Sequence, residues 1–182
     1  MNWLGLLALA GTAIHWAYHL YHQRPWDLLW ACHLAAVLIG IGCIFDWPAC
    51  VGVGVMWLSV GVPMWIISLA TGEEFAPTSL LTHVGGLTVG LIYVAERGMW
   101  PGAWWQALIA LIVLQRVCRW VTPADANVNL AVAVPKGWES WFPSYIWYWL
   151  LMTLVFAMVF VSTELALRWM WGANPHPPEA SG

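Results

Sequence analysis

The chain has 182 residues, of which 62% are hydrophobic and only 8% are charged, and its mean hydropathy is +0.71. Soluble domains carry roughly 25% charged residues, so this composition predicts an integral membrane protein surrounded by membrane lipids. The net charge of -3 comes with no basic block, which argues against a nucleic-acid partner.

Six stretches of the chain are apolar over the length of about 20 residues that a helix needs to cross a bilayer. They are residues 3–21, 26–45, 49–70, 78–95, 103–120 and 145–171. The third stretch contains Pro63, which predicts a kink or break. We therefore expect an all-α fold, a bundle of about six transmembrane helices that forms a single domain over residues 1–171. The Pro- and Gly-rich tail 172–182 is predicted to be disordered.

The basic residues predict how such a bundle is oriented. The first stretch has no preceding Lys or Arg, so we expect it to remain as a span and not to act as a cleaved signal. Six spans then place both termini on one side, with two basic residues there and four on the other side. The positive-inside rule therefore predicts a multi-pass protein whose termini lie on the non-cytoplasmic side. The two are Arg97 and Arg168, and the four are Arg24, Arg116, Arg119 and Lys136.

Small residues in the fourth stretch predict a close helix contact. Gly86 and Gly90 form a GxxxG spacing, which lets two helix backbones approach. His83 shares their helical face and is therefore expected to point at a neighbouring helix. In the sixth stretch, Glu164 and Arg168 are spaced i, i+4 and are expected to pair.

The sequence "HWAYHLYH" places three histidines, His15, His19 and His22, on one helical face. Imidazoles in this pattern are candidate ligands of a metal, haem or chlorophyll. Membrane di-iron oxygenases need more histidines than the six of this chain. The favoured interpretation is hydrogen bonding near the membrane surface, with no metal and no cofactor. A metal, a pigment and the lining of a substrate site remain open alternatives.

A cysteine and a histidine, Cys32 and His33, are adjacent inside the second apolar stretch. Neighbouring helical residues are rotated by about 100°, so these two side chains do not face each other. A nucleophilic Cys32 would therefore need a base from another helix, and His83 is the natural candidate. The alternative is that Cys32 is only a small buried hydrophobic residue.

Three segments together resemble the YwaF-like integral membrane proteins, a group that includes a eukaryotic cysteine-dependent phospholipid acyltransferase. The segments are "ACHLAAVLIG", "FAPTSLLTHVGGLTVGLIYV" and "ANVNLAVAVPKGWESWFPSYIWYW", and the resemblance covers residues 26–149. It implies that Cys32 is the acyl-accepting nucleophile, with His33 beside it and His83 as the histidine of a middle helix. It also matches loop and helix-entry residues to Asn127, Asn129, Pro143 and Tyr145, of which the asparagines and the tyrosine are candidate substrate-binding residues.

Two classes of function follow from these observations. One is a lipid acyltransferase or hydrolase with a Cys/His site inside the bundle, which requires the loop around Asn127 and Asn129 to fold back into the protein. The other is a non-catalytic subunit that packs against other membrane protein subunits of a respiratory or photosynthetic complex, with haem or chlorophyll on a histidine. The sequence leaves open whether the protein is an enzyme.

Overall fold

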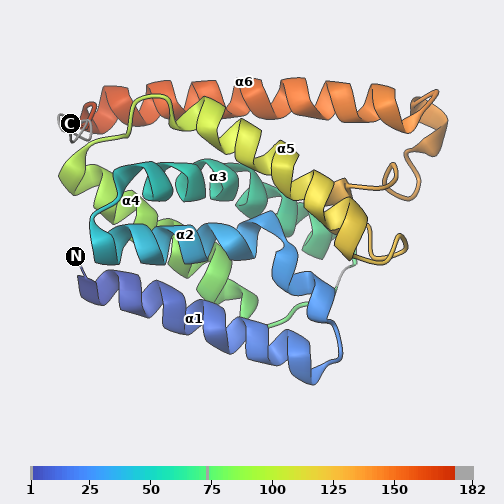
Figure 1. Ribbon diagram of the computed structural model, residues 1–182, viewed down its shortest axis with the longest axis horizontal. Coiled ribbons are helices and arrows are strands. Elements are labelled where there is room, and N and C mark those ends of the chain that lie inside the picture. Colours follow the sequence, from blue (N-terminus) through green and yellow to red (C-terminus); the bar gives the residue numbers. More distant parts are fainter. Residues whose placement is uncertain (1, 73, 175–182) are drawn as a thin grey trace.

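The computed structural model describes residues 2–72 and 74–174, and the regular structure in this part of the chain is helical (Figure 1). The predicted all-α class is therefore confirmed. Within the described residues the α-helices are α1 (Asn2–Tyr21), α2 (Ala31–Phe45), α3 (Pro48–Ala70), α4 (Gly86–Arg97), α5 (Ala103–Val121) and α6 (Tyr145–Trp171). Short 3-10 turns lie at Pro25–Leu29, Val128–Leu130 and Glu139–Trp141, and a π turn lies at Leu81–Gly85.

The helices run back and forth along the long axis of the molecule, so the start of α1 and the end of α6 lie at the same end (Figure 1). Helix α2 lies in the interior and packs against α1, α3 and α4. Its residues Ala35, Ala36 and Ile39 have no exposed surface. One apolar core continues through all six helices, and Leu4, Ile39, Met56, Val89, Ala107 and Phe160 belong to it.

Two helices, α3 and α6, are long and apolar enough to cross a membrane. Helix α6 buries only 17% of its most apolar stretch of 18 residues. Its exposed side chains include Leu150, Leu151, Leu154 and Met158. A continuous apolar surface of this kind is rare on a soluble monomer and fits lipid or a partner protein better than water.

One helix begins later than predicted, and another contains a π turn. The stretch 26–45 opens with the 3-10 turn Pro25–Leu29, and α2 starts at Ala31 because Trp30 has an extended backbone with a ψ of 135°. The stretch 78–95 is helical from Ser79, within one residue of the predicted start, and passes through the π turn Leu81–Gly85 before α4. Single π turns inside helical segments occur often at functional sites, and this one carries His83.

The chain stays helical across Pro63, so a break in the third stretch is wrong, while the kink stays a prediction. Proline removes one hydrogen bond of the helix, which α3 accommodates in its less buried half. The buried half of α3, residues 51–58, is the part that packs in the core.

The predicted close contact of the GxxxG face is confirmed. A Cβ atom built on Gly90 would lie 2.6 Å from Cγ2 of Val55 on α3, and one on Gly86 would lie 3.0 Å from Cβ of Ala36 on α2. A Cβ at Gly90 would require Val55 to shift, and one at Gly86 would require Ala36 to give by a few tenths of an ångström, so the backbone of α4 lies close to both neighbours.

The predicted pair in the last helix is also confirmed, with Nη1 of Arg168 3.4 Å from Oε1 of Glu164. The buried Glu164 carboxylate does more than pair. It accepts hydrogen bonds at 3.0 Å from the backbone N–H groups of Gly102 and Trp104. A carboxylate at this place satisfies N–H groups that have no acceptor within α5 and joins the start of α5 to α6.

The prediction of a disordered tail over residues 172–182 is wrong for its first residues. The N–H of Met99 donates to the Gly172 carbonyl, and the N–H of Asn174 donates to the Met99 carbonyl. These bonds hold the chain after α6 against the loop between α4 and α5. The rest of the predicted tail, residues 175–182, lies outside the described residues.

Candidate functional site

The structure brings together the three residues that were predicted to be catalytic. The sulfur of Cys32 and one ring nitrogen each of His33 and His83 lie within 4.8 Å of one another. The rings of His33 and His83 are 5.9 Å apart between centroids. The prediction that His83 points at a neighbouring helix is therefore confirmed.

The imidazole of His83 is held from two sides. Its Nδ1 lies 2.9 Å from the Ser79 carbonyl, which can only accept, so Nδ1 carries the hydrogen in the neutral ring. The indole of Trp65 on α3 stacks on the imidazole, with 4.9 Å between ring centroids. This arrangement leaves Nε2 of His83 with a lone pair, as a general base requires.

Cys32 lies in the first turn of α2 and is half-buried. Its Cβ would lie only 3.1 Å from a Cβ built on Gly61, so the backbone of α3 passes directly beside it. Although His33 is near the sulfur, both of its ring nitrogens already have other partners. His83 is therefore the histidine of this group that remains available to the thiol.

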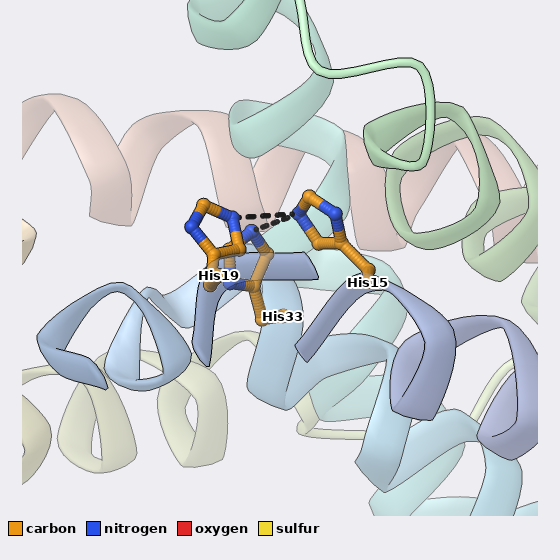
Figure 2. A group of neighbouring side chains, drawn as sticks. All are labelled: His15, His19 and His33. Carbon is orange, nitrogen blue, oxygen red and sulfur yellow. Dashed lines mark hydrogen bonds between the residues drawn. The ribbon is translucent and has the colours of Figure 1, made fainter. Parts of the chain in front are cut away.

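A second cluster adjoins the first and shares His33 with it. Nε2 of His15 lies 3.0 Å from Nε2 of His33 and 3.2 Å from Nε2 of His19, as Figure 2 shows. All three histidines are buried. Two of them come from α1 and the third from α2.

The sequence predicted that His15, His19 and His22 share one helical face, and this prediction is wrong for His22. His22 lies beyond the end of α1, is exposed, and packs on the ring of Tyr18 with 4.3 Å between centroids. His33 takes its place in the cluster. The sequence did contain a feature that could have identified His33 as a member: His33 and His83 are the two histidines that lie well inside predicted spans.

Sequence reasoning missed Asp27, which organises this end of the site. Its carboxylate Oδ2 lies 3.1 Å from Nδ1 of His19 and 2.6 Å from Nε of Arg24. Burial by itself would raise the pKa of Asp27, but the hydrogen bond from His19 and the charge of Arg24 outweigh it, and the pKa lies below its usual value. The carboxyl group is therefore ionised at neutral pH. The sequence feature that could have identified Asp27 is its position as a charged residue at the edge of an apolar stretch.

The loop between α5 and α6 folds back onto the bundle, as the acyltransferase prediction required. Oδ1 of Asn129 accepts the N–H of Ala31 at 2.8 Å, and Nδ2 donates to the Leu29 carbonyl at 2.8 Å. Nδ2 also donates to the sulfur of Cys118. Asn129 therefore positions the start of α2, next to Cys32. With both amide hydrogens in use, its contacts do not support the predicted substrate-binding role.

We expect the substitution Asn129→Ala to lower the free energy of unfolding by about 2 kcal/mol, because the Ala31 N–H and the Leu29 carbonyl would lose their partner beneath the loop. Thermal unfolding of the detergent-solubilised protein, followed by tryptophan fluorescence, measures the change. Asn127→Ala is the matched comparison, since its bonds stay within its own exposed turn. Equal effects of the two substitutions would contradict the positioning role.

The two other predicted substrate-binding residues also lie in this loop region. The Asn127 side chain bonds to the backbone of Val132 and Ala133. The Tyr145 hydroxyl donates to the carbonyls of Leu130 and Ala131, and Arg119 lies over its ring. These contacts organise the loop, and substrate binding by Asn127 and Tyr145 stays a prediction.

Comparisons with known proteins identify no relative, so the functional argument rests on the arrangement of the site residues. No protein-family model, no curated protein and no solved structure matches this chain. The resemblance to the YwaF-like proteins therefore stays a prediction that rests on the three segments described above.

Proposed function

We propose that this chain is a multi-pass membrane protein, and that Cys32 and His83 are the nucleophile and the general base of a lipid acyltransferase or hydrolase. One observation carries the chemistry: a ring nitrogen of His83 lies within 4.8 Å of the Cys32 sulfur. The two residues come from different segments of the chain. A thiol with an imidazole beside it is the usual arrangement of an activated cysteine. The proposal agrees with the resemblance to the YwaF-like group.

The membrane arrangement is supported by the apolar exterior. Helices α3 and α6 meet the length and hydropathy expected of a span. The alternating course of the helices and their exposed aliphatic side chains support our proposal that the other helices also cross the membrane. We place the termini on the non-cytoplasmic side, following the excess of basic residues at the opposite end.

The proposed reaction begins when Nε2 of His83 takes the proton from the Cys32 sulfur. The thiolate attacks the ester carbonyl carbon of a phospholipid, a C–S bond forms, and the ester C–O bond breaks. The leaving lysolipid oxygen takes the proton back from His83. The resulting thioester on Cys32 then passes its acyl group to an acceptor hydroxyl or to water, with His83 again acting as base. The N–H of Ala31 already donates to Asn129 and the N–H of His33 donates to the Trp30 carbonyl, so the N–H of Cys32 is the donor in the first turn of α2 that is suited to stabilise the oxyanion.

A cationic hollow supports a phospholipid as the acyl donor. It has a volume of about 290 Å³ and is lined by Arg116, Arg119, Tyr145, Ile146 and Trp149. Two guanidinium groups in such a hollow are suited to a phosphate headgroup. The hollow is linked to the start of α2, because Trp149 donates to Gln115 and Gln115 donates to the Asn129 carbonyl.

The acyl-transfer proposal is tested by single-turnover acylation of the full chain in detergent. A p-nitrophenyl ester of a medium-chain fatty acid should release a stoichiometric burst of nitrophenolate. Mass spectrometry should find the acyl group on Cys32. We expect the variant Cys32→Ala to lose the burst. Cys50→Ala is the matched control and should keep it, because Cys50 is also a free, half-buried thiol.

Two outcomes would overturn this proposal. A burst of unchanged size in Cys32→Ala would exclude Cys32 as the nucleophile. The absence of any burst, together with isolation of the chain in a stable assembly with other membrane subunits or as a coloured haem or chlorophyll complex, would establish the non-catalytic subunit instead. The exposed apolar face of α6 is the observation that favours this second candidate.

A further inference from the structure

We propose that His15, His19 and His33 bind a divalent transition-metal ion of the zinc class through their three Nε2 atoms. The site uses neither Cys32 nor His83 and is independent of the proposed acyl transfer. The three rings come from α1 and α2 and point their Nε2 atoms at one place, as Figure 2 shows. The ligating atoms lie within 4.8 Å of one another, and each of the three residues is buried, with 8% or less of its surface exposed.

The hydrogen positions in this cluster favour a cation. Nδ1 of His33 lies 2.7 Å from the Asp27 carbonyl, and Nδ1 of His19 lies 3.1 Å from the Asp27 carboxylate. Both partners only accept. The neutral His33 ring therefore carries its hydrogen on Nδ1, and the contact with the Asp27 carboxylate favours the same hydrogen position on a neutral His19 ring, which leaves a lone pair at Nε2 of each. Two lone pairs therefore converge on Nε2 of His15. If Nε2 of His15 carries a hydrogen, that one hydrogen must be shared between the lone pairs of His19 and His33. A metal ion instead accepts a lone pair from Nε2 of each of the three histidines.

Each ligand is oriented by a partner on its other ring nitrogen. These partners are the backbone carbonyl of Asp27 for His33, the carboxylate of Asp27 for His19, and the hydroxyl of Thr78, at 2.8 Å, for His15. Metal-binding histidines typically donate their second N–H to a carboxylate, a carbonyl or a similar acceptor. The Asp27 carboxylate also supplies a negative charge close to the ion.

The distances fit a tetrahedral ion. Zinc–nitrogen bonds of 2.0–2.1 Å at tetrahedral angles place two ligand nitrogens about 3.3 Å apart. The Nε2 separations of 3.0 Å (His15 to His33) and 3.2 Å (His15 to His19) are within a few tenths of an ångström of this value. The same separations leave no room for a porphyrin or chlorin ring between these imidazoles. Three imidazoles suit zinc, cobalt, nickel or copper and not magnesium or calcium.

Three protein ligands leave a fourth position of the ion open to water or another exogenous group. The site lies where α1 and α2 meet the 3-10 turn Pro25–Leu29, which is the end of the bundle that carries Cys32. We therefore assign the cluster to a three-histidine site with one open coordination position at this end of the bundle. It is distinct from the Cys32, His33 and His83 group, with which it shares the His33 ring.

The test is metal titration of the full chain, purified in detergent with a tag that contains no histidine and stripped with a chelator. We expect one Zn²⁺ or Co²⁺ per chain. The Co²⁺ form should show the visible absorption of a tetrahedral site and no thiolate charge-transfer band. His19→Gln should weaken binding more than about 100-fold, and Asp27→Asn about 10- to 100-fold because Asp27 only orients a ligand. His22→Gln is the matched control on an exposed histidine and should bind as the parent does.

Three results would overturn the metal site. One is Co²⁺ binding weaker than the millimolar range in the parent protein, whose fold is checked by its unfolding temperature. Another is unchanged affinity in His19→Gln. The third is a thiolate charge-transfer band that disappears in Cys32→Ala, which would move the ion to the neighbouring group of Cys32, His33 and His83.

Discussion

Replacing His83 by glutamine is expected to slow the acylation of Cys32 by about 100- to 10,000-fold, the range typical for loss of a general base. The glutamine amide can still donate to the Ser79 carbonyl, as Nδ1 of His83 does. It has no lone pair of comparable basicity to take the thiol proton. The rate constant of the nitrophenolate burst, measured by stopped flow across ester concentrations, separates this loss from a loss of binding.

Two comparisons make the His83→Gln result specific. His22→Gln removes an exposed imidazole outside the site and should leave the burst rate unchanged. Metal binding of His83→Gln should also stay unchanged, because His83 is not one of the three proposed ligands. A burst rate in His83→Gln within threefold of the parent would show that His83 is not the base.

Replacing Gly54 by valine is expected to lower the free energy of unfolding by about 3 kcal/mol, through overpacking between α2 and α3. A Cβ at Gly54 would lie 2.6 Å from Cγ1 of Ile39 and 2.7 Å from the Ala35 carbonyl oxygen. The side chain of Ile39 can shift, but the Ala35 oxygen belongs to the backbone of a buried helix. Helices α2 and α3 would have to separate, and Cys32 would move away from Gly61.

Thermal unfolding in detergent, followed by tryptophan fluorescence, measures the effect of Gly54→Val. The matched control is Gly85→Ala, since a Cβ there meets nothing closer than the Leu80 carbonyl at 3.7 Å and the backbone φ is an ordinary −61°. Gly85→Ala should leave the unfolding temperature unchanged or raise it slightly. An unfolding temperature of Gly54→Val equal to that of the parent would contradict the close packing of α2 on α3.

The sequence by itself determined most of the helices and one important contact. Apolar runs bounded by Pro, Gly and charged residues leave few alternatives to helices over 3–21, 49–70, 103–120 and 145–171. Helical periodicity also placed His83 on the face of Gly86 and Gly90, which predicted its approach to a neighbouring helix. Local patterns suffice here, because the spacing of residues within one helix decides these features.

Only the tertiary structure decided which polar residues meet. The same periodicity favoured His22 as the third member of the histidine stripe, but α1 ends at Tyr21 and His33 approaches from α2 instead. Asn129 reaches Ala31 across 98 positions of the chain. Such contacts depend on how helices pack and where loops return, and the spacing of residues along one helix does not contain that information. The histidine cluster and the placement of Asn129 and Asp27 around it are therefore properties of the folded bundle.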